Sequence, residues 1–151
     1  MSSTTFVAGA MLLSMLSSHP GDHEHSRATP EPFTIVALPD TQDYSETAAG
    51  THHFTAQTQW TKDWREPFRI AFATHLGDIV DNGANGGNLI EWERADAAMD
   101  ILDTVLPNGA FPYGVCLGNH DFNVVSDKNS GSTVYDQYFG PARYAGRPWY
   151  H

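Results

Sequence analysis

The chain has 151 residues, of which 18 are Asp or Glu and 8 are Lys or Arg, so its formal net charge is −10. This acidic balance excludes nucleic-acid binding through the phosphate backbone, which requires clustered Lys and Arg. The single Cys excludes a disulfide framework and a zinc site built from Cys side chains of this chain. The length fits one domain, and no apolar run reaches the roughly 18 residues that a membrane-spanning helix needs.

Residues 1–32 are predicted to precede the folded domain, which spans residues 33–151. Phe6–Leu16 is an apolar run whose length suits a secretory signal, although no Lys or Arg precedes it. We therefore predict a secreted or periplasmic protein, and a leader on a cytoplasmic protein is the alternative. Ser17–Pro32 contains three Pro residues and no apolar periodicity, which is typical of a linker.

The remaining sequence alternates between short apolar runs and helical patterns. Strands are predicted at 33–38, 69–76 and 111–117, and helices at 54–66 and 88–106. Trp60, Trp64 and Trp92 have helical spacing and are predicted to lie in the core. Asn88 followed by Glu91 is typical of a helix N-cap with a capping box. This β-α-β-α-β order predicts an α/β fold, with a mainly parallel sheet that helices cover on both faces.

Polar residues follow each predicted strand, where ligands of parallel sheets collect. They are Asp40, Thr41 and Gln42 after the first strand, Gly77, Asp78 and Asp81 after the second, and Gly118, Asn119, His120 and Asp121 after the third. Carboxylate and amide oxygens together with imidazole suit Mn, Fe, Zn or Mg ions. A pair of such ions activates water for attack on phosphorus and offsets the negative charge that would repel a phosphate ester.

Three motifs resemble the first three signatures of the calcineurin-like metallophosphoesterase family. They are D-x-Q at 40–42, G-D-x-x-D at 77–81 and G-N-H-D at 118–121. The first signature is more often D-x-H, and Gln42 departs from it. The strings LPDTQDYS, THLGDIVDNG and YFGPARYAGRPWY resemble an exported bacterial branch. The resemblance covers about residue 33 to residue 151.

The resemblance implies half of a metallophosphoesterase sandwich that hydrolyses a phosphomonoester or phosphodiester with two divalent metal ions. Asp40 and Gln42 would hold the first metal, Asp78 would bridge both metals and Asn119 would hold the second. His120 would stabilise or protonate the leaving oxygen, and Asp121 would orient the His120 ring.

The family's downstream signatures, a lone His and then G-H-x-H, are missing, because His151 is the one His after His120. We therefore expect an incomplete domain that is inactive alone, and an inactive relic with little or no metal binding is the alternative. A sheet built from this part alone would expose a strand edge and apolar surface, so we expect self-association.

Four further features are interpreted as structural. Asp81 is predicted to hold its loop, His75 to be a hydrogen-bonded core residue, and Cys116 to be a small buried hydrophobe within the third strand. The aromatic segment 138–150 is predicted to pack as a covering loop. Binding of substrate phosphate by Arg143 or Arg147 is the alternative for that segment.

Overall fold

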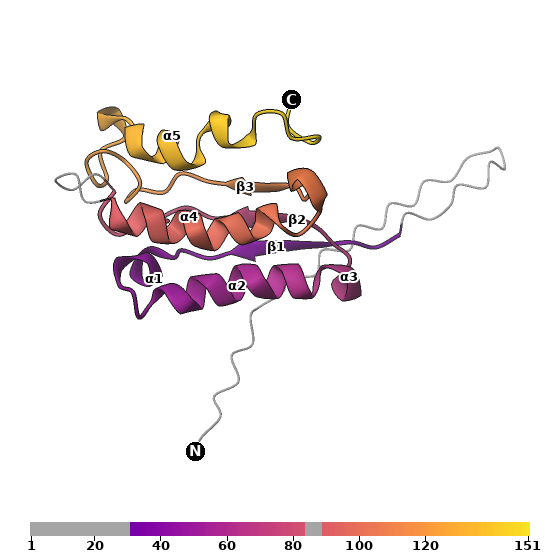
Figure 1. Ribbon diagram of the computed structural model, residues 1–151. Helices are drawn as coiled ribbons and strands as arrows, with labels where there is room; N and C mark the ends of the chain where they lie inside the picture. The colour runs from indigo at the N-terminus through magenta and orange to yellow at the C-terminus, as the bar shows by residue number, and fades with distance from the viewer. Residues whose placement is uncertain (1–30, 84–88) are drawn as a thin grey trace, which may run out of the picture.

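The computed structural model describes residues 31–83 and 89–151, and Figure 1 shows their arrangement. Three strands, β1 (Thr34–Leu38), β2 (Ile70–His75) and β3 (Tyr113–Val115), form one sheet in the order β1-β2-β3. Both pairings are parallel, with Leu38 opposite His75 and His75 opposite Val115. These apolar, β-branched segments confirm the predicted α/β fold with a parallel sheet.

The helices lie between and after the strands. They are α1 (Gln42–Glu46), α2 (Thr51–Asp63), α3 (Arg65–Phe68), α4 (Ile90–Asp103) and α5 (Thr133–Phe139), together with 3₁₀ turns at Pro107–Gly109, Lys128–Ser130 and Pro141–Tyr144. Within the part of the chain that the structure describes, each helix is too short or too polar to cross a membrane.

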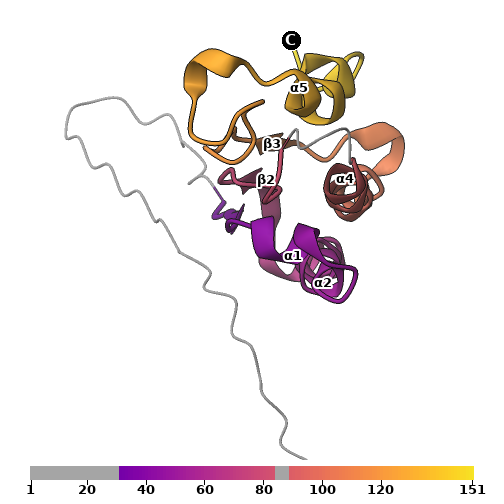
Figure 2. The ribbon, with the colours of Figure 1, turned by 90° about the vertical axis from the view of Figure 1, so that its left-hand side faces the viewer.

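Helices α2 and α4 pack against each other on one face of the sheet (Figure 2). The connections β1-to-β2 and β2-to-β3 both step in the same direction across the sheet. Because such crossovers are almost always right-handed, two steps in one direction put both helices on the same face. The prediction that helices cover both faces is therefore wrong for the described residues. The core between helices and sheet includes Leu38, Phe54, Ala73, Trp92, Met99 and Tyr113.

The opposite face of the sheet, which we call the open face, carries side chains that alternate with the buried ones. Its members are Ile35, Ala37, Phe72, Thr74 and Gly114, and the alternation continues to Leu76 and Cys116 just beyond the strands. Ile35 is 49% exposed. Cys116 is exposed as well, so its predicted burial is wrong, because β3 ends at Val115 and Cys116 follows on the open face.

The helical face predicted from the Trp spacing is interrupted. Helix α2 ends at Asp63, and Trp64 lies at the turn into α3 with 45% of its surface exposed. Trp60 is partly buried and stacks on Phe68, whereas Trp92 of α4 is fully buried as predicted. The prediction that Trp64 is a core residue is wrong because the chain changes direction at that residue.

Candidate functional site

The residues that follow the three strands meet at one edge of the sheet, which we call the rim. The ladder continues past the strands, since the Leu76 N–H donates to the Leu38 carbonyl (3.1 Å) and the Cys116 N–H donates to the His75 carbonyl (3.0 Å). These bonds keep the loops in register where the strands end. The rim therefore brings together 40–42, 77–81 and 118–121, as the sequence predicts for parallel strands.

The backbone at Gly118 passes very close to the backbone and the carboxylate of Asp78. The His120 backbone N–H donates to Asp78 Oδ1 (2.8 Å), which fixes the carboxylate. A Cβ atom at position 118 would collide with the backbone and carboxylate of Asp78, so only Gly fits there. Asp78 itself is held at φ +51° and the preceding Gly77 at φ +97°, both in the left-handed region. A non-glycine residue in this conformation is strained, and such strain is concentrated at functional sites.

The His120 ring lies between the two loops and is held by Asp81. His120 Nδ1 lies 2.8 Å from the Asp81 carbonyl oxygen and 3.4 Å from Asp81 Oδ1. The hydrogen bond to the Asp81 carbonyl raises the pKa of His120, and the negative charges of Asp78, Asp81 and Asp40 add to it against the opposing effect of burial. With Nδ1 donating to the carbonyl, Nε2 is the ring nitrogen left to meet a ligand.

Asp121 is fully buried behind the rim and binds backbone rather than the ring. Its Oδ1 accepts from the N–H groups of Ile79 (2.8 Å) and Val80 (3.4 Å), and its Oδ2 accepts from the Gly118 N–H (2.8 Å). Burial raises the pKa of Asp121, although these three N–H groups oppose the increase. Asp121 therefore fastens the loop after β2 to the loop after β3. The ring contact that the resemblance implied for Asp121 is made by Asp81 instead.

Asp40, Gln42 and Asn119 are the remaining predicted ligands. Asp40 Oδ1 accepts from the Gln42 backbone N–H (3.0 Å), which shapes the turn into α1. Gln42 Oε1 is buried and has no hydrogen-bond partner among the described residues. Asn119 is exposed and its Nδ2 donates to Ser126 Oγ (3.2 Å).

A buried chain of hydrogen bonds beneath the rim includes Thr41, a role that the sequence did not reveal. The Gly77 N–H donates to His75 Nδ1 (3.0 Å), and His75 Nε2 lies 2.9 Å from Thr41 Oγ1. Thr41 Oγ1 in turn donates to the Ile79 carbonyl (3.3 Å). Since Nδ1 accepts, Nε2 carries the proton of a neutral ring. Burial lowers the pKa of His75 to about 4 in spite of the nearby Asp78 charge, which confirms His75 as a hydrogen-bonded core residue.

Glu91 supports the loop after β2 from helix α4. Its buried Oε2 accepts from the backbone N–H groups of Asp81 (2.8 Å) and Asn82 (2.9 Å). The predicted cap residue Asn88 lies outside the described residues. Glu91 therefore fixes the backbone of the loop at Asp81, the residue that contacts the His120 ring. Asp81 itself lies within this loop and helps to hold it, as the sequence predicted.

Arg143 and Arg147 attach the C-terminal segment to α4. Only 10% of the Arg143 side chain is exposed. It pairs with Asp96 and with Asp100 (2.7 Å) and donates to Tyr113 Oη (2.8 Å). Arg147 pairs with Asp103 (2.7 Å). These contacts confirm that the segment packs as a covering loop, and the two guanidinium groups are engaged by α4 rather than turned to the rim.

The described residues contain no group of three or more His, Cys, Asp or Glu side chains arranged to hold a metal ion. Among the four predicted ligands, only Asp40 and Asp78 belong to these residue types, and Gln42 and Asn119 would contribute amide oxygens. The rim is thus a set of oxygen donors beside one imidazole.

One comparison with known proteins gives a relative. A Bacillus subtilis (strain 168) protein described as "Uncharacterized protein YvnB" is 38% identical over 112 residues, which is 74% of this chain. The matched part spans 8% of the length of that relative. Neither a protein-family profile nor a solved structure matches the chain.

Proposed function

We propose that the chain carries part of the site of a metal-dependent phosphoric ester hydrolase, acting on a phosphomonoester or a phosphodiester. The observation that supports this proposal is the position of the His120 ring among the carboxylates of Asp40, Asp78 and Asp81 at the carboxyl ends of three parallel strands. Acidic oxygen donors beside a protonatable imidazole are the groups needed to hold cations and to protonate a leaving alkoxide.

The donor set fits hard divalent cations. Asp40, Asp78, Gln42 and Asn119 offer carboxylate and amide oxygens, which such cations prefer over softer ligands. The buried Gln42 Oε1 is without a hydrogen-bond partner among the described residues, as expected of an oxygen that a cation would engage. Two bound divalent cations would supply a water nucleophile and neutralise the phosphate oxygens.

The residues of the chain itself would orient the ester and move the proton. Asp81 holds Nδ1 of His120, so Nε2 faces the substrate as the proton donor to the leaving oxygen. The raised pKa of His120 favours the imidazolium form that this role requires. Asp121 and Glu91 act by holding the loops that present Asp78 and Asp81.

Metal binding by this chain tests the proposal without requiring turnover. Titration calorimetry with Mn²⁺ should detect binding to the parent, and Asp78→Asn should weaken it by about tenfold or more because a central carboxylate is lost. Asp63→Asn, at the far end of α2, removes the same charge away from the rim and should leave the affinity unchanged. A parent that binds no Mn²⁺, or equal affinities in the parent and Asp78→Asn, would contradict the proposal and favour an inactive relic.

Turnover tests the role of His120 in a longer chain that also carries the downstream His signatures. His120→Asn should slow hydrolysis by roughly 10²–10⁴, the usual reach of general acid catalysis. The loss should be smaller for nitrophenyl phosphate, because nitrophenolate leaves with little protonation. Equal losses for nitrophenyl and alkyl esters would refute proton donation by His120.

We also propose that the chain associates with itself through the free edge of β1 and the adjoining open face. Among residues 31–83 and 89–151, strand β1 is the last strand on its side of the sheet, and Ile35 on β1 and the preceding Phe33 are both exposed. An exposed edge beside apolar side chains is a template for pairing with another strand.

A further inference from the structure

Thr41 lies between two of the predicted cation ligands and is itself enclosed by the protein. It separates Asp40 from Gln42 in the turn after β1, and only 1% of its surface is exposed. Its carbonyl accepts from the N–H groups of Tyr44 and Ser45 (both 2.9 Å) at the start of α1. Because a side chain buried in this way does not meet a substrate, any contribution of Thr41 to the rim acts through its neighbours.

Thr41 is bonded to the loop after β2 around Asp78. Its N–H donates to the Asp78 carbonyl (3.1 Å), and its Oγ1 donates to the Ile79 carbonyl (3.3 Å). Its Oγ1 also accepts from His75 Nε2 (2.9 Å), and the other nitrogen of that ring accepts from the Gly77 N–H (3.0 Å). Thr41 therefore holds backbone groups of three consecutive residues of this loop, directly or through the His75 ring.

These bonds surround the strained part of the rim. Asp78 has φ +51° and Gly77 has φ +97°. Strained backbone persists only where its surroundings hold it in place. Thr41 does so from the turn after β1, and Asp121 does so from the loop after β3. Removal of the Thr41 hydroxyl should therefore let the loop that carries Asp78 move relative to the turn that carries Asp40.

We propose that Thr41 is a positioning residue that sets the separation between the carboxylates of Asp40 and Asp78. The inference rests on the proposed function, in which both carboxylates hold cations. A fixed separation favours cations of one size, because a small cation such as Mg²⁺ demands strict geometry, whereas Ca²⁺ accepts longer and more variable bonds. The Thr41 hydroxyl therefore contributes to the affinity and to the size selectivity of the site without touching a cation.

Cation binding by variants of Thr41 tests this role. Thr41→Val removes the hydroxyl with little change of shape and should weaken Mn²⁺ binding in titration calorimetry by about tenfold, the lower end of the usual effect of losing a group that supports a metal ligand. Thr41→Ser keeps the hydroxyl and should restore the affinity of the parent. Displacement of Mn²⁺ by Mg²⁺ or by Ca²⁺ should show that Thr41→Val weakens Mg²⁺ binding more than Ca²⁺ binding, whereas Asp78→Asn, which loses a ligand, weakens both.

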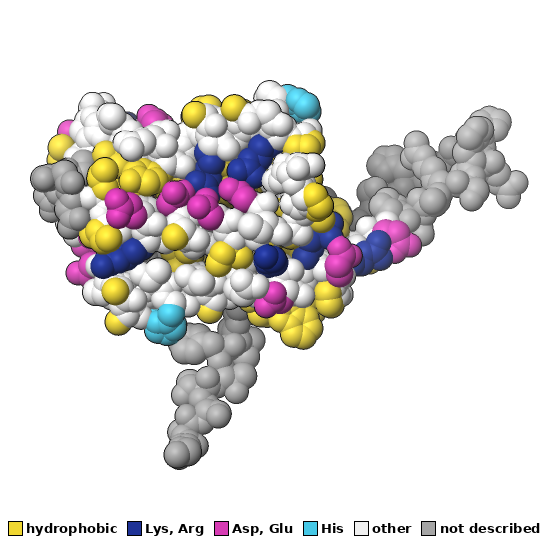
Figure 3. Space-filling model, viewed as in Figure 1, with side chains coloured by type: hydrophobic (Ala, Val, Ile, Leu, Met, Phe, Trp, Pro, Cys, Tyr) yellow, Lys and Arg dark blue, Asp and Glu magenta, His cyan; other side chains and the backbone are white. Residues whose placement is uncertain are grey.

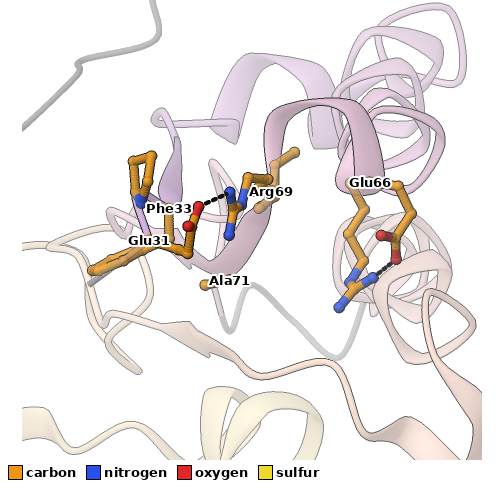
Figure 4. Close-up of a pocket in the computed structure, with 8 residues that line it drawn as sticks. Glu31, Phe33, Glu66, Arg69 and Ala71 are labelled. Carbon is orange, nitrogen blue, oxygen red and sulfur yellow. Dashed lines mark hydrogen bonds and ion pairs between the residues drawn. The ribbon is translucent and has the colours of Figure 1, made fainter. Parts of the chain in front are cut away.

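Thr34 provides the matched control, because it joins the same two strands at the opposite end of the sheet. Its N–H donates to the Arg69 carbonyl (3.1 Å), and its Oγ1 donates to the Phe68 carbonyl (2.7 Å). Figure 4 shows side chains at this end, where Glu31 before β1 pairs with Arg69 before β2. Thr34→Val removes the same hydroxyl at the far end of β1 from the rim, so it should leave the Mn²⁺ affinity unchanged.

Surface carboxylates add a background of weak cation binding. Figure 3 shows Asp and Glu side chains at several places on the side of the molecule that carries α2 and α4, and the formal net charge of the chain is −10. An acidic surface of this kind attracts cations from solution. Because the substitutions at Thr41 and Thr34 change no charge, the background is the same in these variants and in the parent.

The outcomes separate the role of Thr41 from the proposed function. Unchanged Mn²⁺ affinity in Thr41→Val, together with weakened binding in Asp78→Asn, would overturn the role of Thr41 and leave the proposed function standing. Equal losses of Mg²⁺ and Ca²⁺ affinity, or no recovery in Thr41→Ser, would mean that Thr41 only supports the fold. Thr41→Ala, which also lacks the hydroxyl, replaces Thr41→Val if that variant does not fold, and failure of both to fold would likewise overturn the specific role. A parent that binds no Mn²⁺ would overturn both proposals.

Discussion

At the scale of single residues, His75 shows how burial and hydrogen bonding fix one protonation state. Its Nδ1 accepts from the Gly77 N–H and its Nε2 donates to Thr41, so a second ring proton would have to break the bond from Gly77. Burial lowers the pKa of His75 to about 4, well below the value of 6.5 for a free side chain. The neutral ring thereby links the turn after β1 to the loop after β2.

This lowered pKa predicts a pH dependence of stability. Between about pH 6.5 and about pH 4 the unfolded chain binds a proton at His75 that the folded chain does not, so the free energy of unfolding falls as the pH falls. The His75 contribution should amount to about 2 kcal/mol between about pH 7 and about pH 5, and it should flatten below about pH 4.

Urea unfolding of the parent and of His75→Gln at both pH values measures this contribution. The variant should be less stable at neutral pH but should lose less stability on acidification than the parent does. If the two proteins lose equal stability on acidification, the neutral, buried state of His75 is refuted.

The sequence predicted which residues reach the rim but not which of them bind one another. Asp40, Asp78 and His120 could be placed because each follows a strand, and parallel strands end at one edge. Whether Asp81 or Asp121 contacts the His120 ring depends on how two loops cross. That crossing is set by the positive φ of Asp78 and the close approach of Gly118, and neither can be read from residue spacing.

At the scale of the elements, the order of strands and helices followed from apolar periodicity, but the placement of the helices did not. Covering both faces requires the strand order to reverse within the sheet, whereas β1-β2-β3 proceeds in one direction. The predicted end of the helix at residue 66 also differs from the structure, in which α2 ends at Asp63. The Trp60–Trp64 spacing continues a helical pattern past the turn at Trp64, so the pattern does not show where the helix stops. Local patterns identify elements, and the connections decide their faces.

Helix α4 and the C-terminal segment are joined by Arg143, and this junction predicts a stability effect. Arg143→Gln should lower the free energy of unfolding by about 1–3 kcal/mol, because Asp96 and Asp100 would lose a charge-assisted partner at a largely buried guanidinium. Arg69→Gln is the comparison, since its exposed pair with Glu31 should contribute about 1 kcal/mol or less.

Chemical denaturation followed by Trp fluorescence compares the two substitutions directly. A loss in Arg143→Gln no larger than that in Arg69→Gln would mean that aromatic packing alone, such as that of Tyr144 and Trp149 against Tyr113, holds the segment against the domain.

At the scale of the whole molecule, the open face and the net charge have opposite effects on the association of two copies of the chain. The open face contains Ile35, Phe72 and Cys116 and no charged side chain, so two copies could pack there without burying an unpaired charge. The formal charge of −10 makes two copies repel each other at longer range. Because salt screens the repulsion and leaves the apolar contact, the proposed association should strengthen as the ionic strength rises.

Size-exclusion chromatography with light scattering should accordingly show a mass that increases with protein concentration and with salt. Ile35→Lys should shift the chain towards the monomer, because a Lys on an edge strand opposes pairing. Val124→Lys places the same charge at an exposed apolar residue of the loop after β3 and should leave the mass unchanged.

Cys116 reports independently on which surface is covered, since it is the one Cys of the chain and is exposed on the open face. Its reaction with a thiol reagent should slow as the parent concentration rises, and the rate should stay constant in Ile35→Lys. A parent that remains monomeric at high salt would refute the association. A mass that rises while Cys116 reacts at an unchanged rate would refute the involvement of the open face.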